Sequence, residues 1–139
     1  MKLLFQALAL GLGLAGMAEA QSVIARVDVS EQRMRVYSNG QHLYTWPVST
    51  ARRGKYTPRG RWSAKHLSKY HRSSLYNGAK MPFSIFYSGN YAVHGTYSIS
   101  KLGRPASAGC VRLHPDHAET LFYMTQKVGL QNMVVEVQN

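Results

Sequence analysis

The sequence predicts a mainly β fold with one clear helix near its C-terminal end. Apolar residues alternate with polar ones in several short segments, which is the period of a strand with one buried face. An Asn-Gly pair separates two of these segments, which is typical of a β-hairpin. Between residues 115 and 129, apolar residues instead recur every three or four positions, which predicts a helix.

The first strands are predicted from residue 23 onward. Apolar residues alternate from Val23 to Val29, which indicates a first strand. Residues 33–37 and 42–48 form the hairpin, and Asn39-Gly40 supplies its type I′ turn. Pro47 cannot donate a ladder hydrogen bond, so we expect the second hairpin strand at a sheet edge or a bulge.

The middle of the chain is predicted to alternate between loops and strands. Glycine and proline punctuate residues 50–60, which we expect to form a loop. Residues 61–67 are expected to form a further strand, and the polar, tyrosine-rich residues 68–80 a surface loop. Alternating residues in 83–87, a Gly-Asn turn and the run at 91–94 predict two adjacent strands.

The predicted helix begins after His114. Pro115 lies near its first position, Asp116 and Glu119 lie in its first turn, and Gly129 ends it. Its apolar stripe is expected to face the core and consists of Ala118, Leu121, Phe122, Thr125 and Val128. A last strand is predicted over residues 133–137.

The first twenty residues are predicted to be a secretory signal peptide. Lys2 precedes an apolar run from Leu3 to Ala18, which ends in the small-x-small site Ala18-Glu19-Ala20. The run is shorter than the roughly 20 residues that span a bilayer, so we expect cleavage rather than a stable transmembrane anchor. The predicted organisation is therefore a signal peptide at 1–20 and one exported domain at 21–139.

The chain is strongly basic, with 17 Lys and Arg against 6 Asp and Glu and a net charge of +11. Such a charge favours anionic partners, such as wall polymers, lipid headgroups or nucleic acid, although it can also serve solubility alone. The basic residues are scattered and accompany no recognition helix or RNA-binding motif, so we expect no nucleic-acid partner. No cluster with metal-ligand spacing is present, so we expect neither a metal site nor a cofactor.

Cys110 is the only cysteine of the chain. It has no partner for a disulfide within the chain, and a lone thiol in an exported protein is open to oxidation. A purely structural thiol would be readily replaced by alanine or serine. The sequence therefore favours a reactive role for Cys110.

A catalytic thiol needs a base to take its proton and donors for the developing oxyanion. His94 ends the apolar run that begins at Tyr91, and Gly95 follows it, so this histidine emerges where a strand gives way to a loop. Reactive groups are presented accurately at such strand ends. We expect four other histidines to be surface residues: His42, His66, His71 and His117.

Two neighbours of Cys110 have both a functional and a structural interpretation. Gly109 would let a substrate carbonyl approach the backbone amides of residues 109 and 110, or it would simply permit a positive φ angle. In an extended segment Arg112 lies on the same side as Cys110, where it would lower the thiol pKa and bind a carboxylate. Its alternative is a solvated surface arginine.

Two stretches of the sequence, "YAVHGT" and "LGRPASAGCVRLHPDHAETLF", resemble the catalytic region of the L,D-transpeptidase (YkuD-type) family. That family's motif is a histidine, an interval, then Ser/Thr-His-Gly-Cys, an apolar residue and Asn or Arg. The resemblance extends to "TPRGRW" and "MPFSIFYSG" and covers most of residues 23–137. It implies a mixed β-sandwich with the helix packed beside the site.

The resemblance also implies roles for the reactive residues. Cys110 matches the acyl-accepting nucleophile, and His94 matches the base that activates it. Gly95 falls where the family uses a backbone carbonyl to orient the imidazole. Gly109 and Cys110 match the residues whose amides stabilise the oxyanion.

The resemblance further assigns Arg112, Ser107 and Tyr91 to substrate binding, with Arg112 at the position linked to the donor peptide. The chain departs from the family at Ala108, because a histidine usually precedes the glycine of the motif. This departure removes a second imidazole from that position, and His114 is a candidate to replace it.

The function that the resemblance implies is an exported cysteine transpeptidase that acts on peptidoglycan tetrapeptide stems in the periplasm or cell envelope. It would form an acyl-enzyme, release D-Ala and pass the acyl group to an amine. That amine would belong to another stem, to an outer-membrane protein tethered to the wall, or to a free D-amino acid. Two alternatives remain: a hydrolytic L,D-carboxypeptidase on the same stems, and a non-catalytic basic wall-binding protein.

Overall fold

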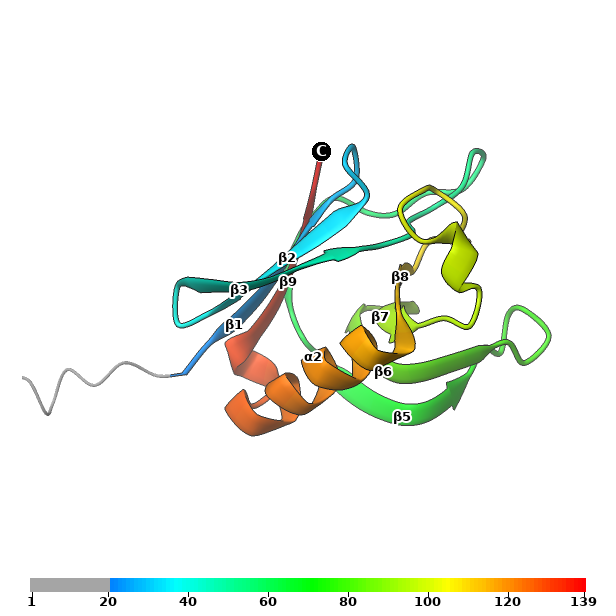
Figure 1. The fold of residues 1–139 in the computed structure, drawn as a ribbon. Coiled ribbons are helices and arrows are strands. Elements are labelled where there is room, and N and C mark those ends of the chain that lie inside the picture. Colours follow the sequence, from blue (N-terminus) through cyan, green and yellow to red (C-terminus); the bar gives the residue numbers. More distant parts are fainter. Residues whose placement is uncertain (1–20) are drawn as a thin grey trace, which may run out of the picture.

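The structure, a computed structural model, describes residues 21–139, which form two β-sheets and one α-helix (Figure 1). The first sheet has the order β3-β2-β1-β9-β4, in which β1 and β9 are parallel and the other neighbours antiparallel. Its strands are β1 (Val23–Asp28), β2 (Arg33–Ser38), β3 (Gln41–Pro47), β4 (Gly60–Ser63) and β9 (Met133–Gln138).

The second sheet has the order β5-β6-β7-β8. Its β7 and β8 are parallel, and its other pairs are antiparallel. Both sheets therefore mix parallel and antiparallel pairs, and the predicted mixed β-sandwich is confirmed. The four strands are β5 (His66–Arg72), β6 (Lys80–Ser88), β7 (Tyr91–Gly95) and β8 (Val111–Leu113).

The predicted hairpin is formed by β2 and β3. Asn39 and Gly40 both have positive φ, 51° and 79°, as the two central residues of a type I′ turn require. β3 is an edge strand, so the missing N–H of Pro47 interrupts no inner ladder.

The core lies between the two sheets and is filled by side chains from alternate strand positions. In β1, Val23, Ala25 and Val27 are buried while the residues between them are half-buried. Each fully buried aliphatic side chain stabilises the fold by roughly 1.5–3 kcal/mol. The core residues of the other strands include Met34, Val36, Met133, Val135, Ile85, Tyr87, Val93, Val111 and Leu113.

The predicted helix is present as α2 (Pro115–Val128) and packs on β6 and β7 (Figure 1). Pro115 is its first residue, and the His114 side chain accepts a hydrogen bond from the Asp116 N–H, which caps the helix. Gly129, with φ of 92°, ends it. Its buried residues are Ala118, Leu121, Phe122 and Thr125, and Val128 packs against the core partly buried.

The predicted boundary between strand and loop in residues 61–80 is wrong. β4 ends at Ser63, the chain crosses to the other sheet, and β5 continues to Arg72 through part of the expected loop. The side chains of β5 are exposed or half-buried, so the strand lacks a buried apolar face that alternation would reveal. Its pairing with β6 holds it in the sheet instead.

The predicted signal peptide lies outside the described residues. Within residues 21–139, no helix has the length and apolar character needed to cross a membrane.

The packing of α2 can be tested by truncating Leu121, which is fully buried. Leu121→Ala is expected to lower the free energy of unfolding by about 2–5 kcal/mol, because it removes apolar burial and leaves a cavity. Leu130→Ala is the matched control, since Leu130 is exposed and should cost about 1 kcal/mol or less. Urea unfolding measures both, and equal losses would contradict the burial described for α2.

Candidate active site

The parallel pairing of β7 with β8 places His94 and Cys110 on the same face of the sheet. Val93 pairs with Val111, and His94 pairs with Arg112. Val93 and Val111 point into the core. Because side chains alternate along a strand, the residues that flank these two valines point to the opposite face. That face therefore carries His94 from β7, Arg112 from β8, and Cys110 from the position directly before β8.

The imidazole of His94 is buried and held in one orientation. The residue is 5% exposed, and its Nδ1 lies 2.7 Å from the carbonyl oxygen of Gly95. A carbonyl oxygen can only accept, so Nδ1 carries the proton and Nε2 is left as a base. The pKa of His94 is lowered to about 4, chiefly by burial. The hydrogen bond to Gly95 opposes this shift, and the charges of Arg112 and His71 contribute to it.

The glycine at position 95 also allows close packing behind the histidine. A Cβ there would lie 3.1 Å from Cα of Pro115, the first residue of α2, and 3.1 Å from Cγ of Pro82. The start of the helix therefore packs directly beneath the carbonyl that orients His94.

Cys110 is half-buried and protonated at rest. Burial raises the pKa of its thiol, while the Ala92 amide and the positive charge of Arg112 lower it to a smaller extent. The expected effect of Arg112 is thus present, but desolvation outweighs it. Sγ donates a long hydrogen bond of 3.7 Å to the Asn90 carbonyl, and within residues 21–139 no hydrogen bond joins it to His94. A neutral thiol therefore lies beside a neutral imidazole.

The backbone before Cys110 is folded around the buried Ser107. The Ser107 hydroxyl donates to the Cys110 carbonyl oxygen at 2.6 Å and accepts from the Gly109 N–H at 3.0 Å. Gly109 has φ of 143°, and a Cβ there would lie 2.8 Å from Tyr91 Cε1 and 3.0 Å from the Tyr56 carbonyl oxygen. The structural interpretation of Gly109 is therefore supported, because a side chain would not fit at this position. Its amide donates to Ser107 in the resting site, so stabilisation of an oxyanion by this amide stays a prediction.

A second segment, which sequence reasoning treated only as a loop, holds this turn in place. The N–H groups of Ala106 and Ser107 both donate to the Thr50 carbonyl oxygen, at 3.0 and 2.9 Å. The buried Thr57 hydroxyl donates to the Gly109 carbonyl oxygen at 2.9 Å. The motif "TPRGRW" drew attention to Thr57 in the sequence. Its hydrogen-bond partner, Gly109, lies 52 residues away and could not be predicted from the motif.

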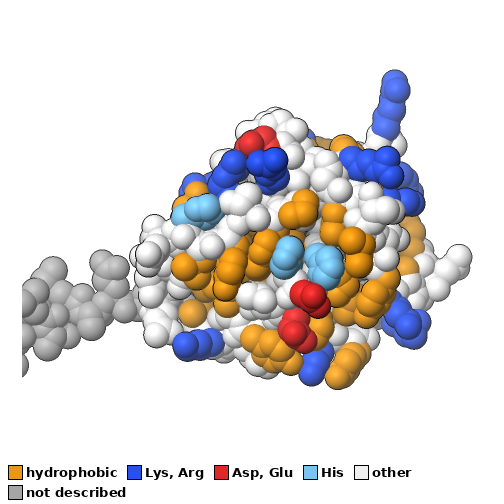
Figure 2. Space-filling view, in the orientation of Figure 1, with side chains coloured by type: hydrophobic (Ala, Val, Ile, Leu, Met, Phe, Trp, Pro, Cys, Tyr) orange, Lys and Arg blue, Asp and Glu red, His pale blue; other side chains and the backbone are white. Residues whose placement is uncertain are grey.

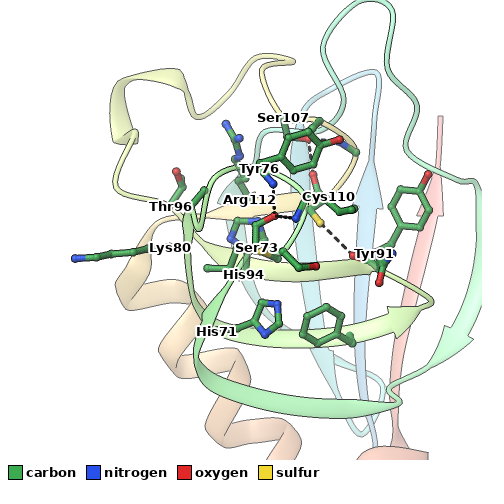
Figure 3. Close-up of a pocket in the computed structure, with 18 of the residues that line it drawn as sticks. His71, Ser73, Tyr76, Lys80, Tyr91, His94, Thr96, Ser107, Cys110 and Arg112 are labelled. Carbon is green, nitrogen blue, oxygen red and sulfur yellow. Dashed lines mark hydrogen bonds between the residues drawn. The ribbon is translucent and has the colours of Figure 1, made fainter.

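His94, Cys110 and the turn before Cys110 border a cavity of about 780 Å³ (Figure 3). In Figure 3, side chains from the β7 and β8 strands and from the preceding turn converge on Cys110. The structure therefore gathers the predicted site residues, with the Gly95 carbonyl held behind His94. Those that line the cavity are Tyr91, His94, Ser107, Gly109, Cys110 and Arg112.

The expectation that His71 is a surface residue is wrong, because its half-buried ring lines the same cavity (Figure 3). It packs edge-on against Phe86, with ring centroids 4.9 Å apart. Its partner across the sheet, Met81, also faces the cavity, because the alternation of β6 reverses at Phe83, whose φ is 54°. Pro82 was the only sequence signal for this irregularity.

His114 and His117 lie elsewhere. His117 is half-buried and stacks on Trp46 with ring centroids 4.8 Å apart, so it is a partly exposed residue held by packing. His114 caps α2 and is not among the described residues that line the cavity, so it does not replace the motif's missing imidazole. Figure 2 shows histidine and acidic side chains side by side among hydrophobic ones over the region of α2, with basic side chains toward the rim.

The cavity is cationic. Among the described residues that line it, three are basic, namely Arg52, Lys80 and Arg112, and none is acidic. Residues 21–139 also contain no group of three His, Cys, Asp or Glu side chains placed to hold a metal ion. The site therefore favours an anionic ligand.

Gly109→Ala tests the turn before Cys110. It is expected to lower the free energy of unfolding by about 1–3 kcal/mol more than Gly103→Ala, because only at position 109 does the new Cβ overlap other atoms. Gly103, with φ of 93° and open space around it, has a similar backbone constraint and is the matched control. Urea unfolding measures stability, and the iodoacetamide alkylation rate reports the placement of the thiol. Equal effects of the two variants would contradict the overlap.

The buried His94 predicts a loss of stability in acid. Because its pKa falls from 6.5 to about 4 on folding, its contribution is complete above pH 6.5 and is lost as the pH falls toward 4. His94→Gln should therefore lose less stability than the unmodified protein between about pH 7 and about pH 4.5, measured by urea unfolding. His42→Gln, the same substitution at an exposed histidine of the β3 edge strand, is the control for the loss of an imidazole as such. An unchanged dependence in His94→Gln would contradict the burial of a neutral ring.

Comparison with known proteins adds to this geometry. The sequence model of the YkuD family, described as the L,D-transpeptidase catalytic domain, matches residues 22–136. Curated protein sequences give no match.

Solved structures of three L,D-transpeptidases share the fold. LdtMt1 in complex with imipenem has 23% identity and a TM-score of 0.75, over 85% of this chain and 59% of that one. The enzyme from Mycobacterium smegmatis has 22% identity and a TM-score of 0.74, over 86% and 59%. That from Stackebrandtia nassauensis has 22% identity and a TM-score of 0.74, over 87% and 57%. This chain thus spans less than two thirds of the length of these structures.

The family match extends from β1 to within β9 and includes His94 and the turn that carries Cys110. On this evidence the chain belongs to the YkuD family of L,D-transpeptidase catalytic domains.

Proposed function

We propose that this chain is an exported L,D-transpeptidase that acts on peptidoglycan tetrapeptide stems with Cys110 as its nucleophile. The observation that carries the proposal is the buried imidazole of His94, fixed by the Gly95 carbonyl on the same sheet face as the chain's lone thiol. Nucleophilic catalysis by cysteine uses such a thiol and an oriented base. Family membership supports the substrate class.

In the first half-reaction, the Cys110 thiol transfers its proton to Nε2 of His94, and Sγ attacks the carbonyl carbon of the third stem residue. Backbone amides of the turn, at Cys110 and Gly109, stabilise the oxyanion; the Gly109 N–H would first exchange its bond to Ser107. The C–N bond to the terminal D-Ala then breaks. His94 returns the proton to the leaving amine, and a thioester remains on Cys110.

In the second half-reaction, an amine attacks the thioester carbonyl and gives a proton to His94. The new amide forms, the C–S bond breaks, and His94 returns the proton to Sγ. One amide replaces another, so the reaction needs no ATP. The low pKa of His94 and the raised pKa of Cys110 keep the resting pair neutral, so the thiolate forms only as the substrate is attacked.

The remaining assignments follow from the same proposal. Arg112, Ser107 and Tyr91 line the cavity and would contact the donor stem. The predicted signal peptide supports export to the periplasm or cell envelope, where stem peptides, D-amino acids and outer-membrane proteins would supply acceptors.

Acylation by imipenem tests the nucleophile and the base. This probe is chosen because the related LdtMt1 structure holds imipenem. Intact-mass spectrometry should show one imipenem added to the unmodified protein, no adduct in Cys110→Ser, and a rate reduced by about 100-fold or more in His94→Ala. His42→Ala is the control, because His42 is an exposed residue of the β3 edge strand and should react normally. No adduct on the reduced, unmodified protein would contradict the proposal and favour a non-catalytic wall-binding protein.

Product analysis with purified muropeptides identifies the acceptor. Release of D-Ala with formation of cross-linked dimers is expected, because the thioester would be taken by another stem's amine. Tripeptide as the only product would show that water is the acceptor and that the chain is an L,D-carboxypeptidase. Neither D-Ala release nor cross-linked dimers should be detected with Cys110→Ser.

A further inference from the structure

Arg52 lines the cavity from a segment distant in sequence, and backbone hydrogen bonds fix this segment to the Cys110 turn. Ser49 and Arg112 exchange two bonds, of 3.0 and 2.9 Å, and the Arg52 N–H donates to the Ser107 carbonyl oxygen at 2.8 Å. The Thr57 hydroxyl joins the same segment to Gly109. These bonds fix the backbone of Arg52 relative to Cys110, even though the Arg52 side chain is exposed.

Arg52 and Arg112 both line the cavity, and neither is neutralised by the protein. Within residues 21–139 neither guanidinium lies within ion-pair distance of a carboxylate, although Arg26, Arg35 and Arg61 each have such a partner. The hydrogen bond that Arg112 makes from Nη1, to the Ala106 carbonyl oxygen, is long at 3.4 Å. Most of the guanidinium donors of Arg112 therefore remain free for a ligand.

Arg52 and Arg112 line the same cavity, so their positive charges act on the same space. Burial lowers the pKa of Arg112, the Cys110 thiolate would raise it, and the Arg52 charge lowers it. Two guanidinium groups around a half-buried position, without an acidic neighbour, leave a local positive potential that an anion would relieve. Their planar donor forks match the two oxygens of a carboxylate.

We infer that Arg52 and Arg112 together form a carboxylate-binding subsite beside Cys110. The inference rests on the proposed function and adds Arg52 to it, as a residue that recognises a free carboxylate close to the scissile amide of the donor stem. A tetrapeptide stem offers two such groups, the terminal carboxylate of D-Ala and a side-chain carboxylate on a third residue that is a diamino diacid. Both have the chemistry that the arginine pair recognises.

The neighbouring arginine provides a matched control. Arg53 follows Arg52 in the same turn, is exposed, and is not among the described residues that line the cavity. Arg52→Ala and Arg53→Ala remove the same charge from adjacent positions and leave the backbone bonds of the segment in place. A difference between them therefore reports on the cavity and not on the net charge of the chain.

The experiment measures binding of uncleaved peptides in a Cys110→Ala background, so that it does not depend on turnover. Isothermal titration calorimetry compares three synthetic tetrapeptides: one with both carboxylates free, one amidated at its C-terminus and one amidated at the side chain of its third residue. Arg52→Ala is expected to raise the Kd of the first peptide by about tenfold or more, whereas Arg53→Ala leaves it unchanged. The amidated peptide whose Kd no longer depends on Arg52 identifies the carboxylate that is bound.

Three results would overturn the inference: an Arg52→Ala effect no larger than that of Arg53→Ala, an equal effect on all three peptides, or no binding of the first peptide to the Arg52-containing protein. The proposed function is tested separately, by imipenem acylation and D-Ala release with Cys110 intact. If the protein is active but its peptide binding does not depend on Arg52, only the subsite inference is refuted. If the protein binds the peptide through Arg52 but is never acylated, only the transpeptidase proposal is refuted.

Discussion

The hydroxyl of Ser107 is the interaction on which the geometry of the site depends. It is fully buried, and it bonds both the Cys110 carbonyl and the Gly109 amide, so it closes the turn that presents the thiol. The same residue's backbone bonds Thr50 and Arg52. Ser107 thereby closes the nucleophile's turn with its side chain and joins that turn to the segment of Arg52 with its backbone. Loss of any one of these bonds would leave buried polar groups unpaired, which is costly in a desolvated site.

Support for this turn extends further into the first sheet. Gln32, in the tight turn between β1 and β2, donates from Nε2 to the Thr50 hydroxyl at 2.6 Å and accepts from the Thr50 N–H at 3.0 Å. Both side chains are buried. The position of Cys110 therefore depends on a polar network that runs from one sheet to the other, and such networks specify a unique geometry when every member is satisfied.

Burial also determines the electrostatics. Desolvation disfavours the charged forms of both Cys110 and His94, so both groups are neutral at rest. Arg112 therefore has no thiolate beside it to balance its charge. The cavity is then positive at rest and carries no nucleophilic anion. An anionic peptide would enter a site of opposite charge, and the proton transfer that creates the thiolate would occur against the bound substrate.

The local patterns of the sequence predicted most of the fold. Alternation identified β1, β2, β6, β7 and β9, the Asn39-Gly40 pair identified the hairpin turn, and helical spacing identified α2 with both of its ends. The pattern failed for β5, whose side chains are all at least partly exposed, because such a strand is held by its ladder with β6 and leaves no apolar alternation. Alternation also does not continue across Phe83, because Met81, the cross-strand partner of His71, faces the cavity and not the core.

The sequence by itself determined which residues are candidates for chemistry: a lone thiol at Cys110, a strand-end histidine at His94, and a glycine before the thiol. Only the tertiary structure decided what surrounds them. The register of β7 on β8 brought His94 and Cys110 to one face, and the bonds to residues 49–57 brought Arg52 to the cavity. Local sequence does not encode these pairings, because register between distant segments depends on packing across the whole sheet. Burial in that packed arrangement then shifted the pKa values of both reactive groups.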